Sequence, residues 1–202
     1  MELAAVLSID LCTYEFTPRP MIWPKETAPV ILRENGRTEL RSMRWGLIPH
    51  WADDEKIGTK MINARSETAA QKPAFREAWQ SRRCLIPATG FYEWNNRGGS
   101  SDPTGCGQAY HFTNPTRPLF CFAGLWERWH RPPTKQSELF ENTFEPPPPI
   151  LETFTLLTTE PNDVVKKYHD RMPVILGEGA GEWLKGNENL IEETEPLKAC
   201  PL

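Results

Sequence analysis

The sequence predicts an α+β fold, a single domain built around one β-rich core with a few short helices. Proline supplies 20 of the 202 residues, about twice its average share, and proline disrupts helix interiors. A mainly helical bundle is therefore disfavoured. Short apolar runs separated by turn residues recur along the chain, a pattern typical of many short strands. No linker-like segment divides the chain, so the predicted domain spans residues 1–202.

The first half of the chain carries the clearest hairpin signal. Residues 28–34 form an apolar, β-branched run, and residues 40–47 form its expected return strand. Between them lies Asn35-Gly36, a dipeptide that favours a type I′ turn. Residues 73–80 then fit a short amphipathic helix.

The remaining strands are predicted from further apolar runs, over residues 84–87, 90–94, 109–113, 119–126 and 153–159. Residues 95–107 are rich in Gly, Ser and Asn and predict a loop. A long loop is also expected between the last two strands, ending in the proline run 146–149. Residues 161–168 and 178–185 suit short helices.

Charge is uneven along the chain. The formal net charge is −4, which excludes a globally basic nucleic-acid-binding protein. Residues 138–202 hold 5 Lys and Arg against 13 Asp and Glu, whereas residues 33–83 hold 11 against 7. The middle of the chain is therefore compatible with a local basic face, which is what governs electrostatic binding.

The cysteines and histidines follow no metal-binding or disulfide pattern. The five cysteines are Cys12, Cys84, Cys106, Cys121 and Cys200, an odd number with no C-x-x-C spacing. We expect no disulfide framework, no metal site, no cofactor and a reducing cytosolic compartment. No window approaches the roughly 18 apolar residues of a membrane span, so no membrane association is expected.

Four segments place ionisable residues directly beside aromatic residues or proline. They are Arg44–Trp51 (RWGLIPHW), Asn63–Thr68 (NARSET), Gly90–Trp94 (GFYEW) and His169–Pro173 (HDRMP). Packing alone does not require ionisable residues at these positions, so the segments are candidates for a functional site.

Two of these segments offer candidates for proton transfer. Glu93 interrupts an apolar strand; it either faces solvent or lies in an aromatic pocket, where burial would raise its pKa and suit it to acid–base work. His169 follows a predicted helix; it either interacts with the helix dipole or moves protons near neutral pH.

Other residues suggest nucleic-acid contacts or thiol chemistry. Asn63 and Arg65 share one face of a strand, and an arginine can bind a phosphate with two hydrogen bonds. Trp51 can stack on a base, whereas we favour a core position for Trp45. A Cys–His peptidase would use Cys84 or Cys121, although their apolar strand patterns favour buried, inert thiols.

Taken together, the segments resemble the SRAP family, SOS response-associated peptidase-like proteins that process abasic sites in DNA. The resemblance runs from about residue 20 onward, through WGLIPHW, NARSET, RRCLIPATGFYEW, AGLWERW, TFTLLTT and HDRMPVIL. It implies an α+β fold around a barrel-like core of short antiparallel strands, with a groove for single-stranded DNA. It also implies a covalent reaction, in which an N-terminal Cys attacks the aldehyde of an abasic site and closes a thiazolidine ring.

The resemblance also assigns roles to residues of this chain. Asn63 would place the reacting N-terminus, Glu93 would shuttle protons, and His169 would stabilise the abasic sugar. The DNA contacts would come from Pro24, Trp51, Arg65, Thr158 and Arg171. The implied partner is single-stranded DNA with abasic sites, bound by a monomer in the bacterial cytoplasm, at the nucleoid when on DNA.

The sequence departs from the family pattern at both ends. The family begins Met-Cys-Gly-Arg, whereas this sequence begins Met1-Glu2-Leu3-Ala4 and stops where the family's last strand starts. We therefore expect the N-terminal nucleophile segment and the C-terminal strand to be incomplete, which leaves catalytic activity open. The alternatives are a thiol peptidase, acting on itself or on others, and a non-catalytic module that binds single-stranded DNA.

Overall fold

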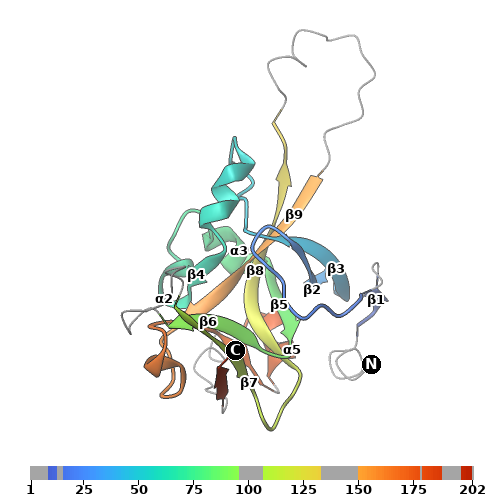
Figure 1. Ribbon diagram of the computed structural model, residues 1–202. Helices are drawn as coiled ribbons and strands as arrows, with labels where there is room; N and C mark the ends of the chain where they lie inside the picture. The colour runs from blue at the N-terminus through green and yellow to red at the C-terminus, as the bar shows by residue number, and fades with distance from the viewer. Residues whose placement is uncertain are drawn as a thin grey trace, which may run out of the picture.

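A five-stranded closed barrel forms the centre of the molecule. The computed structural model describes residues 9–12, 16–95, 107–132, 150–177, 179–187 and 197–201. The larger sheet runs β1-β3-β2-β5-β8-β9-β10, and an additional pairing of β3 with β9 closes the barrel; β11 joins β8 and β4 joins β9. The strands of this sheet are β1 (Leu11–Cys12), β2 (Thr27–Glu34), β3 (Arg37–Trp45), β4 (Asn63–Arg65), β5 (Arg83–Ala88), β8 (Phe120–His130), β9 (Ile150–Thr159), β10 (Met172–Pro173) and β11 (Ile175–Leu176). The predicted α+β fold with a barrel-like core is confirmed (Figure 1).

The predicted hairpin is present. Strands β2 and β3 pair antiparallel from Thr27 opposite Arg44 to Glu34 opposite Arg37. Asn35 and Gly36 have φ angles of 51° and 79°, both in the left-handed region that a type I′ turn needs. The prediction from the dipeptide is therefore confirmed.

Strands β8 and β9 are longer than the sequence predicts. They pair continuously from Gly124 opposite Leu156 to His130 opposite Ile150, and their far ends extend above the rest of the barrel in Figure 1. The predicted strands ended at Trp126 and began at Thr153, next to the charged residues Glu127, Arg128 and Glu152. In the fold these residues pair across the strands, as Arg128 does with Glu152 at 2.8 Å.

A smaller sheet packs against the barrel. It runs β12 (Lys198–Pro201), β7 (Gln108–Thr113) and β6 (Phe91–Asn95), all antiparallel. β5 and β6 are consecutive in the chain but lie in different sheets, because β2 and β8 occupy both edges of β5. Of the predicted loop 95–107, only residues 95 and 107 are among the described residues. The proline run 146–149 lies wholly outside them.

The helices are short: η1 (Glu55–Lys60), α2 (Ser66–Ala69), α3 (Arg76–Ser81), η2 (Val165–Lys167) and α5 (Ala180–Leu184). The predicted helices over 73–80 and 178–185 are present only in part, as α3 and α5. The predicted helix over 161–168 is present only as the single turn η2. The Asn162 side chain accepts the N–H groups of Val164 and Val165, as the N-cap residue of a helix does, and the Asn162 carbonyl oxygen accepts the N–H of Lys166. No helix among the described residues is long and apolar enough to cross a membrane.

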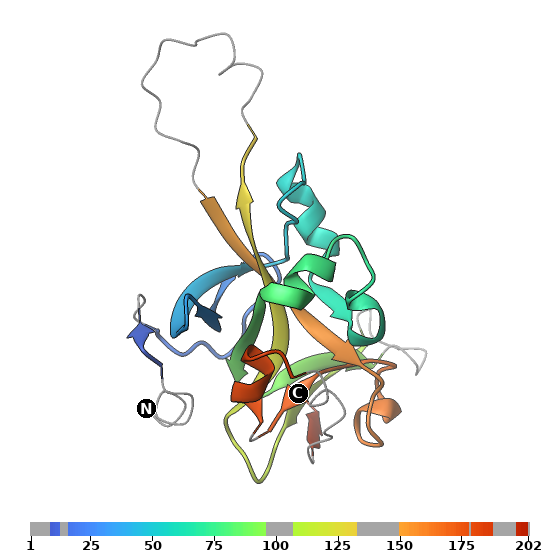
Figure 2. The same ribbon diagram turned by 180° about the vertical axis from the view of Figure 1, so that it is seen from behind.

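Strand β2 is buried on both faces. Val30 and Leu32 contact one apolar cluster, which also contains Phe112 and Leu197 of the smaller-sheet region. Ile31 points the opposite way, into a second cluster with side chains of α3 and α5 such as Trp183. Figure 2 views the molecule from the side that carries these helices. Burial of both faces explains why β2 is an unbroken apolar run.

Candidate functional site

The C-terminal end of β9 brings two of the four segments together. β4 runs parallel to β9 with Arg65 opposite Thr158, and β10 runs antiparallel with Pro173 opposite Thr158. NARSET and HDRMP therefore lie on either side of Thr158. Ala64 is buried, so Asn63 and Arg65 point to the exposed side of β4, as the spacing predicts.

A bidentate ion pair locks these two segments together. Both terminal nitrogens of Arg171 donate to the Glu67 carboxylate at 2.8 Å, and Nη2 also donates to the carbonyl oxygen of Thr158 at 2.6 Å. The hydrogen bond from Arg171 lowers the pKa of Glu67. The Arg171 guanidinium, which the resemblance assigns to phosphate binding, is thus engaged by protein groups.

Glu93 and His169 face each other next to this ion pair. His169 Nε2 lies 3.8 Å from Glu93 Oε2, and the Glu93 side chain is 24% exposed. His169 Nδ1 lies 3.0 Å from the Arg171 carbonyl oxygen, a contact that orients the ring. Burial raises the pKa of Glu93; the adjacent His169 lowers it and Asp170 raises it further. Glu93 is therefore partly shielded from solvent, between the two interpretations of the sequence.

Aromatic packing explains why these two residues meet. The β6–β7 register places Tyr110 opposite Glu93. The ring of Tyr168 packs 4.2 Å from that of Tyr110, centroid to centroid. His169 follows Tyr168 directly, so this contact carries the histidine to the carboxylate.

The loop from Gly46 to Met61 presents Trp51 on the surface. Gly46 (φ 120°) and Gly58 approach so closely that a Cβ on either would lie under 3 Å from the other's carbonyl oxygen. Trp129 Nε1 donates to the Ala52 carbonyl oxygen at 2.7 Å and holds the loop against β8. Trp51 is 51% exposed, which is consistent with a contact surface.

Trp51 lines an open hollow of about 380 Å³ together with Lys60, Met61, Asn63, Lys72, Pro73, Ala74 and Phe75. The hollow extends from Trp51 to Asn63. Asn63 lies on β4, which pairs with the C-terminal part of β9. Trp45, in contrast, stacks on Phe154 with ring centroids 6.3 Å apart, and its predicted core position is confirmed.

Pro24 lies in a tight turn beside β3 and β6. Lys25 N donates to the Trp45 carbonyl oxygen at 2.8 Å. Trp23 is exposed, and its ring centroid lies 5.9 Å from that of Trp94, the neighbour of Glu93. The turn thus adds an exposed aromatic ring that the sequence analysis did not single out.

The thiols of the barrel are unsuited to nucleophilic catalysis. Cys84 and Cys121 are buried, and burial raises both thiol pKa values, that of Cys121 to about 12. A peptidase that uses either thiol is disfavoured, because a thiolate is the nucleophile. Cys12 is exposed and Cys200 half-buried, while Cys106 lies outside the described residues. Over the described ranges, no group of three or more His, Cys, Asp and Glu could hold a metal ion.

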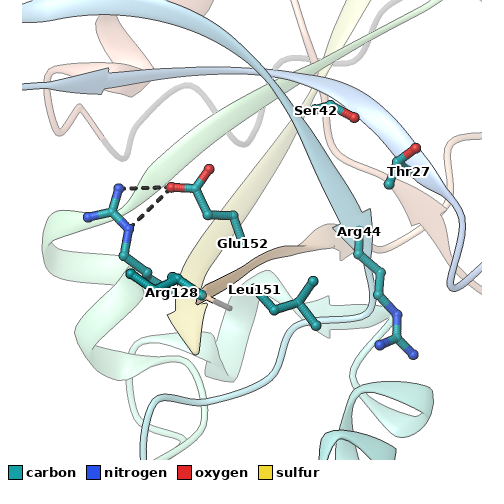
Figure 3. A pocket seen from close by; sticks show the side chains of 7 residues that line it. Thr27, Ser42, Arg44, Arg128, Leu151 and Glu152 are labelled. Atoms are coloured by element: carbon teal, nitrogen blue, oxygen red, sulfur yellow. Dashed lines mark hydrogen bonds and ion pairs between the residues drawn. The ribbon is translucent and has the colours of Figure 1, made fainter. Parts of the chain in front are cut away.

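A second hollow, of about 480 Å³, lies at the opposite end of β9 (Figure 3). Its lining comprises Thr27, Ser42, Arg44, Arg128, Ile150, Leu151 and Glu152. Glu152 binds Arg128 there, and Figure 3 shows Arg44 pointing away from this pair. None of the sequence-predicted site residues lines it.

Comparison with known proteins identifies the family. A sequence model of the family described as SOS response associated peptidase (SRAP) matches residues 2–201. The chain belongs to the SRAP family. Abasic site processing protein YoqW of Bacillus subtilis (strain 168) is 43% identical over 171 residues, which cover 84% of this chain and 68% of YoqW. Abasic site processing protein HMCES of Gallus gallus is 30% identical over 190 residues, covering 80% of this chain and 52% of HMCES.

Crystal structures of two bacterial proteins share this SRAP fold. A protein from Bordetella bronchiseptica superposes with a TM-score of 0.74 at 26% identity, covering 99% of this chain and 93% of the other. A protein from Bacteroides thetaiotaomicron gives a TM-score of 0.69 at 29% identity, covering 88% and 74% of the two chains.

The structure adds site residues that sequence reasoning missed. Glu67 lies within the quoted NARSET segment, but its partner Arg171 is 104 positions away in the chain, so no local pattern indicates the pair. Lys60 and Lys72 contributed only to the regional excess of positive charge, which was the one sequence signal that pointed to them.

Proposed function

We propose that this SRAP-family protein processes abasic sites in single-stranded DNA, using Glu93 and His169 to move protons. The observation that carries the proposal is the 3.8 Å approach of these two side chains beside the exposed face of Asn63 and Arg65. The names of the YoqW and HMCES relatives support the processing of abasic sites. Such a protein would act on nucleoid DNA in the cytoplasm.

The chemistry begins with opening of the abasic sugar. Its ring-closed hemiacetal becomes an aldehyde when the hydroxyl on C1′ loses a proton and the ring oxygen gains one. Glu93, with its raised pKa, and His169 are positioned as a pair that can accept one proton and donate the other. Asn63 lies on the same exposed surface and would orient the reacting groups.

The covalent step follows on the aldehyde. An N-terminal amine adds to C1′, water leaves, and an imine forms; the thiol of an N-terminal Cys then adds across the imine, giving a thiazolidine. Imine formation needs a proton delivered to the departing oxygen, and addition of the thiol transfers the thiol proton to the imine nitrogen; His169 and Glu93 would carry these protons. Residue 2 of this sequence is Glu2, so the test below compares this start with a Met-Cys-Gly-Arg start.

The remaining site residues would hold the DNA strand. Arg65 is exposed and offers a guanidinium to a phosphate. Trp51 would stack on a base, and Pro24 would bound the strand near Trp94. Thr158 and Arg171 would act mainly through the ion pair with Glu67, which fixes the HDRMP segment.

The test is incubation with a single-stranded oligonucleotide that carries one abasic site, followed by denaturing electrophoresis. We expect a chain with a Met-Cys-Gly-Arg start to form an adduct that resists denaturation, and the Glu93→Gln and His169→Ala variants of it to form the adduct more slowly. The chain beginning Met1-Glu2 is expected to bind the oligonucleotide without forming that adduct.

Two outcomes would contradict this proposal. Absence of an adduct with the Met-Cys-Gly-Arg start would reject abasic-site processing. An adduct that forms equally fast in the Glu93 and His169 variants would reject their role in proton transfer. Salt-sensitive binding without any adduct would instead favour the non-catalytic DNA-binding alternative.

A further inference from the structure

A column of aromatic rings connects the barrel to the reaction site. The ring of Phe122, on β8 of the barrel, lies 6.1 Å from that of Phe91, which stacks on Phe112 at 4.9 Å. Phe112 meets Tyr168 edge-on at 5.6 Å, and Tyr168 packs on Tyr110 at 4.2 Å, all measured between ring centroids. Aromatic pairs attract one another at centroid separations of about 4.5–7 Å. The column therefore runs without a break from the barrel to the surface of the smaller sheet.

Strand β7 holds two rings of this column from both sides. Tyr110 and Phe112 lie on β7, the central strand of the smaller sheet, which pairs with β6 along one edge and with β12 along the other. Phe112 is also fully buried in the apolar cluster that it shares with the barrel. Side chains in a close-packed interior have little room to shift, so these two rings form a rigid support for Tyr168.

Both members of the proton-transfer pair, Glu93 and His169, are joined to this support. Glu93 lies directly opposite Tyr110 in the register of β6 and β7. His169 follows Tyr168 directly in the chain, so the place of the Tyr168 ring constrains the place of the imidazole. The separation of 3.8 Å between His169 Nε2 and Glu93 Oε2 is thus spanned by a single pair of packed rings.

We propose that Tyr168 and Phe112 are positioning residues of the reaction, which act through His169 by holding it within reach of Glu93. The inference rests on the proposed function, because the separation matters to the rate only if the two side chains exchange protons with one substrate. Proton transfer requires hydrogen-bond reach, directly or through one water, and a misplacement of about 1 Å can slow a reaction about a hundred-fold. A role limited to core packing predicts a loss of stability alone.

The first test measures the titration of the Glu93 side-chain carboxyl by carbon-13 NMR, without DNA, with E93Q to assign the signal. Burial raises the pKa of Glu93 and the adjacent His169 lowers it. H169Q should therefore raise the titration midpoint of Glu93 when Tyr168 is present. In Y168L the histidine is released, so H169Q should raise the midpoint much less. Any change in hydration that Y168L itself causes is common to both members of the second comparison and cancels.

The second test measures the rate of adduct formation in chains with the Met-Cys-Gly-Arg start. Y168L and F112L should form the adduct about ten- to a hundred-fold more slowly. Y168F keeps the ring and should match the wild-type chain in both tests. The matched control is L85V, which reduces packing in the second apolar cluster, with α3 and α5. It should change neither the rate nor the effect of H169Q on the Glu93 midpoint.

The outcomes separate this inference from the proposed function. An equal effect of H169Q with and without the Tyr168 ring would overturn the inference, as would an equal slowing of the adduct by L85V. If Y168L does not fold, F112L takes its place in the titration, because Phe112 contacts Tyr168 from β7. If the chain with the Met-Cys-Gly-Arg start and all its rings forms no adduct, the proposed function is rejected, and the titration alone decides whether the rings hold His169 beside Glu93.

Discussion

Glu93 is a carboxyl group whose charged form the fold disfavours. Burial raises its pKa above the ordinary value, so its contribution to stability is fully present below that ordinary pKa and is lost as the pH rises through the raised pKa. Glu93→Gln does not titrate and avoids this loss. We therefore expect the stability of E93Q relative to wild type to increase as the pH rises through the raised pKa of Glu93, measured by urea unfolding between pH 4 and pH 8. A difference that stays constant over this range would contradict the burial of Glu93.

The pKa of Glu67 is shifted in the opposite direction to that of Glu93, so the stability of the fold should depend on pH in the opposite way. Arg171 lowers its pKa, so the ion pair stabilises the fold above the ordinary pKa of a glutamate and stops doing so as the pH falls through the lowered value. Arg171→Lys removes the bidentate hydrogen bond to Glu67 and should lower the free energy of unfolding by about 1–2 kcal/mol at pH 7. The loss is no larger because Glu67 is partly exposed, and solvent weakens the ion pair. The loss should shrink at acid pH. Urea unfolding of R171K and E67Q checks this, and an equal loss at pH 3 and pH 7 would show that packing dominates.

At the residue scale, the sequence indicates which side chains could do chemistry, but it does not show which of them lie in contact. Glu93 was found because it interrupts an apolar strand, and His169 because it follows a predicted helix in a segment rich in ionisable residues. Their mutual approach was not readable from the residues, since it depends on Tyr110 and Tyr168, which lie on separate elements. The family resemblance assigned both residues to one reaction, and the aromatic contact explains how they come close.

At the element scale, the Trp51 loop depends on two glycines. A Cβ on Gly58 would lie 2.7 Å from the Gly46 carbonyl oxygen and 3.1 Å from Ile48 Cγ1, so the loop must shift to accept it. Gly58→Ala should lower the free energy of unfolding by about 1–3 kcal/mol and weaken binding to single-stranded DNA by displacing Trp51. Thermal unfolding and anisotropy measure the two effects. Gly181→Ala is the control, because a Cβ there has no neighbour within 4 Å; equal behaviour of the two variants would refute the close approach.

Sequence signals predicted an element well where its partner is the next element in the chain. The β2–β3 hairpin follows from one dipeptide between two apolar runs, and it forms as predicted. The outer parts of β8 and β9 could not be predicted, because their charged residues become compatible with a strand only when Arg128 finds Glu34 and Glu152. The placement of β6 in a second sheet likewise depends on β2 and β8 having already filled the edges of β5.

At the scale of the whole molecule, the barrel brings segments that are far apart in the sequence together at one site. Two of the four segments reach the C-terminal end of β9 by strand pairing: β4 carries the start of NARSET, and β10 carries the end of HDRMP. A third segment, GFYEW, lies on the smaller sheet and meets them at the contact between Glu93 and His169. The same closure encloses the barrel thiols, which separates the site from any internal cysteine.

That separation predicts how the thiols respond to a reagent. With Cys12, Cys106 and Cys200 replaced by Ala, only Cys84 and Cys121 remain, both buried. With a pKa of about 12, about one Cys121 thiol in ten thousand is ionised at pH 8, and access is blocked as well. The triple variant should therefore resist a thiol-reactive disulfide reagent while folded and release two equivalents of chromophore when unfolded in urea. It should also bind abasic-analogue DNA like the wild-type chain, whereas rapid reaction of one thiol in the folded protein would revive the thiol-peptidase alternative.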